Sequence, residues 1–173
     1  QIIQILQDLC TQLVIYQRGK NLSPVLTLRE KCSTNYRVSF AMTNIFRNKK
    51  ILVAGGTGLV GQQLVPKLIK LGAKVFVVSL DDKSLANKKI EDFYSLDLMN
   101  LDNCIKVTKN KEIIFNLLGV TGSPKINIEK PASFMMSNIY CAINLLMAAQ
   151  ISKVKKYLYT STYGVYAHSA KMK

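Results

Sequence analysis

The residues whose types and spacing could do chemistry are the glycines of the segment Ala54-Gly55-Gly56-Thr57-Gly58-Leu59-Val60-Gly61. Gly56, Gly58 and Gly61 fit the pattern Gly-x-Gly-x-x-Gly, while Gly55, Gly58 and Gly61 fit Gly-x-x-Gly-x-x-Gly. In both patterns the glycines permit a tight strand-to-helix turn and let the backbone approach a pyrophosphate, which then faces the free N–H groups of the helix. The segment therefore predicts a binding site for NAD or NADP, formed by Gly55, Thr57, Gly58, Leu59, Val60 and Gly61.

The elements predicted around this segment are those that such a turn needs. Ile51 to Ala54 is a short apolar run typical of a strand, and Leu59 to Leu71 has helical spacing. Val75 to Leu80 is a continuous apolar run, as expected of a parallel strand buried on both faces. A strand–helix–strand unit is the context in which a glycine pattern becomes specific. The alternative interpretation is a glycine-rich turn that holds no ligand.

Two acidic residues, Asp81 and Asp82, follow the second predicted strand. A carboxylate about 20 residues beyond such a glycine turn commonly binds the ribose hydroxyls of NAD. Its negative charge would repel the additional phosphate of NADP, so we expect NAD or NADP with a slight preference for NAD. The alternative is that both acids are loop residues in solvent.

Strand and helix patterns alternate through the rest of the chain. Alternation of this kind pairs the strands in parallel through right-handed crossovers. We therefore expect an α/β Rossmann fold, a doubly wound parallel sheet whose five visible strands have the order 3-2-1-4-5, with its carboxy-terminal part missing. The further elements are expected at Phe93–Leu96 (strand), Asn100–Thr108 (helix), Ile113–Leu118 (strand), Ala132–Gln150 (helix) and Tyr157–Ser161 (strand).

Residues 1–41 do not share this alternation. One amphipathic helix is compatible with the apolar spacing of Ile2, Ile5, Leu6, Leu9 and Leu13, after which no clear period follows. Our hypothesis is that Met42 is the true start, that residues 1–41 lie outside the fold, and that residues 42–173 form a Rossmann domain truncated after strand five. The alternative is an amino-terminal helix that packs on the domain or on a partner.

Composition and charge argue against several other classes. A net charge of +14 could suit nucleic acid, but the lysines scatter in pairs with no long basic run, so we expect no nucleic-acid partner. The sequence contains no uninterrupted run of about 18 apolar residues, so we expect no membrane span. Four separated cysteines and one histidine offer little to a metal ion, and we interpret the cysteines as reduced thiols of a cytoplasmic protein.

From about Lys49 to Tyr166, the chain resembles the extended short-chain dehydrogenases, the NAD-dependent epimerase/dehydratase family that acts on nucleotide sugars. The glycine segment is similar to the family's turn in its Gly-x-x-Gly-x-x-Gly register. Asp97-Leu98 resembles the acidic–apolar pair that meets the adenine amino group. Asn116-Leu117-Leu118-Gly119 stands where the family has His-Leu-Ala-Ala, whose last two residues line the cofactor. The loop from Gly119 to Pro131 is most similar to GDP-fucose synthase-like members.

Two further segments complete the resemblance. Pro131 to Asn138 is similar to the family's Pro-x-x-aromatic…Asn helix opening, and Tyr159 to Tyr166 resembles its Ser-Ser-x-x-Val-Tyr-Gly segment. The resemblance implies that Thr162 is the catalytic residue, whose hydroxyl would bond the reacting oxygen of the substrate. Beside Asp81, which its spacing indicates, the resemblance implies a wider cofactor-binding set: Ser79, Asp97, Leu98, Leu118, Gly119, Asn138 and Thr160. Ser79 occupies the usual place of the ribose-binding acid, which leaves the choice between NAD and NADP open.

Catalysis in the family depends on a Tyr-x-x-x-Lys pair that follows the fifth strand. The one match in this chain, Tyr16 to Lys20, precedes the first strand, and we interpret it as chance. The resemblance implies an NAD(P)-dependent nucleotide-sugar epimerase, dehydratase or reductase, present here as an inactive amino-terminal portion and expected to be a homodimer when intact. The alternative is a non-catalytic NAD(P)-binding sensor or scaffold.

Overall fold

Six strands form one sheet in the order β1-β6-β5-β2-β3-β4. The structure is a computed structural model that describes residues 13–17, 45–119 and 131–160. Five of the strands run parallel and, counted along the chain from β2, have the spatial order 3-2-1-4-5, which confirms the expected Rossmann topology. The strands are β1 (Leu13–Gln17), β2 (Lys50–Ala54), β3 (Lys74–Ser79), β4 (Asp92–Ser95), β5 (Ile113–Asn116) and β6 (Lys156–Thr160).

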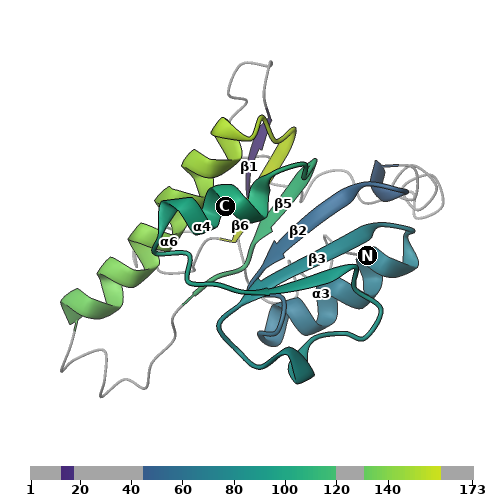
Figure 1. The fold of residues 1–173 in the computed structure, drawn as a ribbon, viewed down its shortest axis with the longest axis horizontal. Coiled ribbons are helices and arrows are strands. Elements are labelled where there is room, and N and C mark those ends of the chain that lie inside the picture. The colour runs from purple at the N-terminus through teal and green to yellow at the C-terminus, as the bar shows by residue number, and fades with distance from the viewer. Residues whose placement is uncertain (1–12, 18–44, 120–130, 161–173) are drawn as a thin grey trace, which may run out of the picture.

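Helices cover both faces of this sheet (Figure 1). α3 (Leu59–Lys70) packs on one face, and α4 (Leu101–Thr108) and α6 (Pro131–Ile151) pack on the other. A single-turn 3-10 helix, η1 (Lys83–Leu85), follows β3 and was not predicted from the sequence. Each of the other helices and parallel strands lies within two residues of its predicted bounds, because continuous apolar runs and helical spacing are local signals of burial.

The central strand β2 shows why its residues are apolar throughout. Ile51 and Val53 belong to the cluster beneath α3, whereas Leu52 and Ala54 belong to the cluster beneath α4 and α6. All four are fully buried. Successive side chains of a strand point to opposite faces, so a strand covered on both faces needs an apolar residue at every position.

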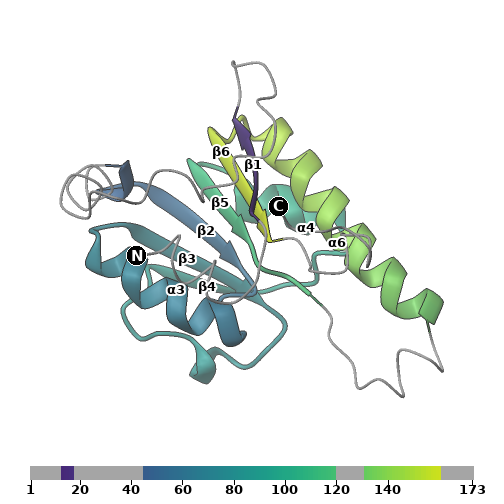
Figure 2. The same ribbon diagram turned by 180° about the vertical axis from the view of Figure 1, so that it is seen from behind.

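The edge strand β1 corrects the expectation that all of residues 1–41 lie outside the fold. Leu13 to Gln17 pair antiparallel with β6, with Leu13 opposite Thr160 and Gln17 opposite Lys156 (Figures 1 and 2). Leu13, which the apolar spacing assigned to a helix, therefore lies in a strand. A free sheet edge exposes unpaired backbone groups, and β1 pairs those of β6. The rest of the amino-terminal segment and the start at Met42 lie outside the described residues.

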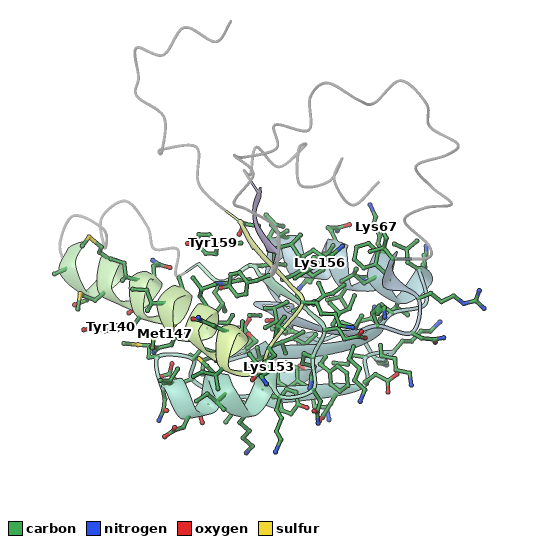
Figure 3. All side chains as sticks on the ribbon, turned by 90° about the horizontal axis from the view of Figure 1, so that it is seen from above. Lys67, Tyr140, Met147, Lys153, Lys156 and Tyr159 are labelled. Carbon is green, nitrogen blue, oxygen red and sulfur yellow. The ribbon has the colours of Figure 1, made fainter. Side chains whose placement is uncertain are left out.

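The helix α6 leaves a row of large apolar side chains exposed. Tyr140 is 45% exposed and Met147 also 45%, and both are labelled along α6 in Figure 3. The opposite side of the helix, with Leu145 and Ala148, is fully buried. None of the described helices combines the length and the apolar character that crossing a bilayer would need. An exposed apolar row of this kind marks a surface suited to contact with another protein segment.

Glu112 joins three strands at the amino ends of the sheet. Its Oε1 accepts hydrogen bonds from Lys49 Nζ at 3.0 Å and Lys155 Nζ at 3.1 Å. Its carbonyl oxygen accepts bonds from the backbone N–H groups of Lys155 and Lys156. Partial burial opposes ionisation of the Glu112 carboxyl, but the bonds from the two lysines hold its pKa below the ordinary value.

A chain that begins at Met42 should remain folded but lose the cover on β6. Among the residues whose burial the structure describes, the first member of the two buried clusters is Phe46, so a chain from Met42 keeps all of these core residues. We expect a Tm lowered by about 2–4 °C and self-association that grows with concentration, since an open strand edge pairs with other chains. Sedimentation velocity measures the association. Ile15→Pro in the full chain, which breaks the middle of β1, should reproduce it; unchanged sedimentation of both variants would contradict the role of β1.

Glu112→Gln should lower the free energy of unfolding at pH 7 by about 0.5–1 kcal/mol, because a neutral amide cannot form these ion pairs. The pKa of Glu112 is lower in the folded chain, so the stabilisation is present above the unfolded value near 4.3 and is lost as pH falls through the folded value. Urea denaturation of both proteins from pH 7 to pH 2.5 measures the difference. Glu91→Gln, at an exposed position, is the control. A difference that stays constant down to pH 2.5 would contradict the assignment.

Candidate functional site

The glycine turn lies at the point where the strand order reverses, because β3 flanks β2 on one side and β5 on the other. Gly55 begins the turn with a φ of +77°, a backbone conformation in which a residue with a side chain would be strained. Its N–H donates to Val78 O of β3 at 2.9 Å, while a Cβ there would lie 3.1 Å from Leu117 O beyond β5. Ligands of doubly wound sheets bind outside the carboxyl ends of the strands at such a switch point.

The glycines of this turn divide into two kinds. A Cβ at Gly61 would collide with Gly55 O and lie 2.5 Å from the carbonyl carbon of Gly56, and a Cβ at Gly56 would lie 2.7 Å from the side chain of Val77. These positions are glycine because α3 and β3 pack against the turn. At Gly58, by contrast, the nearest atom is Gly55 O at 3.4 Å, an ordinary contact. Packing therefore does not demand glycine at position 58, and Gly58 is exposed on the open side of the turn.

The amino end of α3 lies at this open side of the glycine turn. Gly58 is the N-cap residue, and the first turn, Leu59 to Gly61, holds no acidic side chain. The N–H groups of a helix's first turn have no intrahelical partner and carry the positive end of its dipole. Gln62 fixes the turn from within the helix, since its Nε2 donates to Thr57 O at 2.9 Å. The sequence analysis did not identify Gln62, because nothing in its spacing distinguishes it from an exposed helical glutamine.

The acids after β3 have separate roles. The Thr57 hydroxyl lies 2.6 Å from Asp81 Oδ2 and 2.7 Å from Ser79 Oγ, and Ser79 Oγ lies 3.1 Å from Asp81 Oδ2. The three predicted residues thus meet in one cluster beside the glycine turn. Asp82 instead caps η1 by accepting a bond from Ser84 N at 2.7 Å, and this bond holds the pKa of Asp82 below its ordinary value.

The predicted adenine pair follows β4. Leu98 is buried and Asp97 is exposed, with Asp97 Oδ1 accepting a bond from Met99 N at 2.9 Å. Two asparagines that the sequence analysis missed hold this segment, for Asn103 Nδ2 donates to Asp97 O at 2.9 Å and Asn144 Nδ2 donates to Met99 O at 2.7 Å. Asn144 lies on α6, and its contact with Met99 joins distant segments of the chain, which no local sequence pattern predicts.

Asn116 organises the carboxyl ends of β5 and β6. Its side chain is fully buried, donates through Nδ2 to the Tyr157 hydroxyl at 2.9 Å and accepts through Oδ1 from Leu118 N at 3.1 Å. Thr160 Oγ1 donates to Asn116 O at 3.3 Å. Asn116 therefore fixes the backbone of Leu118, one of the predicted lining residues. The sequence placed Asn116 at the end of this strand but did not predict its hydrogen bonds, which an asparagine inside an otherwise apolar strand could have indicated.

Cys104 and Cys141 carry free thiols. Cys104 Sγ donates to Leu98 O at 3.2 Å, and burial raises the pKa of the Cys104 thiol to about 12, so it remains a protonated donor. Burial also raises the pKa of Cys141. Among the residues that the structure describes, no three His, Cys, Asp or Glu side chains gather as metal ligands.

The structure brings most of the predicted set to one edge of the sheet. Each of the following groups comes directly at or after the carboxyl end of a different parallel strand: Gly55 to Gly61, Ser79 with Asp81, Asp97 with Leu98, Leu118 with Gly119, and Thr160. Asn138 lies instead within α6. Thr162 lies outside the described residues. Whether these side chains contact a cofactor remains a prediction.

A glycine turn at the switch point of a doubly wound parallel sheet defines a Rossmann-fold protein. Residues 51–173 match the NAD dependent epimerase/dehydratase family, and the chain belongs to that family. GDP-mannose 3,5-epimerase 1 of Oryza sativa subsp. indica is 27% identical over 121 residues, which make up 68% of this chain and 32% of that protein. The chain thus spans about a third of the length of the curated relatives it matches.

Solved structures agree with this assignment. The UDP-glucose 4-epimerase of Thermotoga maritima, solved with UDP-glucose, has a TM-score of 0.55 and 29% identity over 61% of this chain and 35% of that chain. The UDP-glucose 4-epimerase of Thermus thermophilus, solved with NAD, has a TM-score of 0.54 and 23% identity over 61% of this chain and 35% of that chain, a likeness of fold.

Gly58→Val should separate binding from folding. Its backbone, with φ −70° and ψ 174°, suits any residue, so only the N-cap preference of about 1 kcal/mol is lost, and the Tm should fall by about 2–4 °C. The valine would fill the space that a pyrophosphate needs, and calorimetry should show NAD affinity reduced by about 10-fold or more. Gly61→Ala is the contrasting variant, expected to unfold the domain. Unchanged NAD affinity in folded Gly58→Val would refute the site.

Proposed function

We propose that this chain is the NAD(P)-binding portion of a nucleotide-sugar epimerase, dehydratase or reductase. The intact protein would exchange a hydride between a sugar carbon and the nicotinamide, which is the chemistry that the bound cofactor supplies. Membership of the epimerase/dehydratase family and the nucleotide-sugar epimerases among its relatives support this class of reaction. The proposed cofactor is NAD or NADP, with a preference for NAD.

The observation that carries the proposal is the contrast between Gly58 and Gly61. Gly61 is required by packing, but Gly58 is not, and Gly58 faces the amino end of α3. A backbone cradle left open beside a helix N-terminus fits a pyrophosphate, because the phosphate oxygens can accept several N–H bonds there. Asp97 follows β4 and Leu118 and Gly119 follow β5, at strand ends on opposite sides of β2. We propose that Asp97 contacts the adenosine half and the backbone of Leu118 and Gly119 the nicotinamide half.

The substrate end of the proposal rests on Thr162, which we propose as the catalytic residue that hydrogen-bonds the reacting oxygen of the sugar. A nucleotide sugar is the proposed substrate, because related epimerases carry GDP-mannose or UDP-glucose in their names. We also propose that the intact protein is a homodimer. The exposed apolar row on α6 is compatible with a subunit interface.

A non-catalytic NAD(P)-binding module is the second candidate. Within residues 1–173 the single Tyr-x-x-x-Lys match begins at Tyr16, which lies in β1 opposite Tyr157. Tyr157 is the second residue of β6, near the amino end of that strand, whereas the glycine turn lies at the carboxyl ends of the parallel strands. This placement favours dinucleotide binding without turnover for residues 1–173.

The test combines binding and turnover on the 173-residue chain. We expect NAD to bind, by calorimetry, and UDP-glucose and GDP-mannose to remain unconverted, since loss of general acid–base help alone costs about 10²–10⁴-fold in rate. Gly58→Val is the binding control. Absence of binding for both NAD and NADP would overturn the proposal. Turnover of either sugar by this chain would overturn the second candidate and the assignment of Tyr16 to Lys20 as chance.

A further inference from the structure

The cluster of Thr57, Ser79 and Asp81 connects the glycine turn to the end of β3. Thr57 lies in the turn and is 4% exposed, Ser79 is the last residue of β3 and is 8% exposed, and Asp81 is exposed in the loop that follows. The Asp81 backbone N–H donates to Ser79 Oγ at 3.2 Å, so the loop turns back on itself. This local turn directs the Asp81 side chain toward the strand end.

The Asp81 carboxylate is held by side chains from two elements. Thr57 Oγ1 and Ser79 Oγ lie 2.6 Å and 3.1 Å from the same oxygen, Asp81 Oδ2. Each hydroxyl has one proton to donate and an ionised carboxylate has none, so Asp81 is the acceptor of the cluster. Both contacts use Oδ2, and the second carboxylate oxygen can accept further bonds.

As a result, the carboxylate of Asp81, two residues beyond β3, lies beside the side chain of Ser79, the last residue of β3. Ser79 replaces the acid expected at that position, yet the carboxylate of Asp81 lies next to the Ser79 hydroxyl. A loop acid loses side-chain freedom when it is fixed in this way, and the fixed charge then acts without further ordering on a ligand's arrival. Thr57 supplies the shorter of the two contacts and sits in the turn proposed to hold the pyrophosphate.

We propose that Thr57 is a positioning residue that holds the Asp81 carboxylate as the acceptor for the adenosine ribose hydroxyls, and that this contact makes the site select NAD over NADP. The inference rests on the proposed function and deepens it by assigning cofactor choice. A fixed carboxylate accepts bonds from the 2′- and 3′-hydroxyls of NAD. The 2′-phosphate of NADP would bring negative charge against it, at short range and beside two buried hydroxyl-bearing residues.

The experiment compares dissociation constants for NAD and NADP by calorimetry on the full chain. The unsubstituted chain should bind NAD at least about 10-fold more tightly than NADP, a ratio typical of one lost charge-assisted hydrogen bond. Thr57→Val removes the hydroxyl at nearly constant volume and should reduce that ratio about 5- to 10-fold, mainly by weakening NAD. Thr57→Ser, which keeps the hydroxyl, should restore most of the ratio. A structural role alone would not distinguish the two cofactors.

Two further variants keep the test decisive. Thr108→Val removes another buried threonine hydroxyl, which lies in α4 and is 2.8 Å from Ser152 Oγ just after α6. It should lower stability while leaving the NAD-to-NADP ratio unchanged. Asp81→Asn changes an exposed side chain and should abolish the preference even if Thr57→Val fails to fold.

The outcomes separate this inference from the proposed function. Binding of neither cofactor would overturn the proposed function and this inference with it. Binding of both with equal affinity, tighter binding of NADP, or a ratio that Thr57→Val leaves unchanged would overturn the inference alone. A loss of preference in Thr57→Val that Thr57→Ser restores would support it.

Discussion

The close approach of the first turn of α3 to the end of β2 is the constraint on which the rest of the site depends. Gly61 touches the backbone of Gly55 and Gly56, so no side chain fits between helix and strand. This contact sets the direction in which the helix N-terminus points. The cradle at Gly58 and the place of Thr57 both follow from it, since these residues bridge the two elements.

Burial on both faces of the sheet gives that turn a fixed frame. The core beneath α3 and the core beneath α4 and α6 share the strands β2, β3 and β5, so neither layer can shift without disturbing the other. The positions of polar side chains within this packed sheet are therefore well defined. Asn116, fully buried among apolar neighbours, has its two side-chain atoms committed to Tyr157 and Leu118, because an unpaired amide there would be costly.

The two edges of the sheet differ in whether an additional strand covers the parallel strands. β4 lies at one edge with half-buried aromatic residues, while β6 is covered by β1 from the other end of the chain. A strand from far away in the sequence can take this place because the open edge of β6 presents backbone N–H and C=O groups that another extended segment can pair. The same tolerance explains why residues 13–17 carried no clear sign of their partner.

The sequence by itself determined the five parallel strands, their order and the glycine turn. The strands and the turn depend on neighbouring residues, as the apolar run at Ile51 to Ala54 and the glycine spacing up to Gly61 illustrate. The order was expected from the alternation of strands and helices that is typical of a Rossmann fold. Only the tertiary structure decided that Leu13 lies in a strand, that Asp81 turns back to Thr57, and that Asn144 reaches the loop after β4. These contacts join residues brought together by the chain's path, and a pattern of burial carries no record of which distant side chain will lie within hydrogen-bond reach.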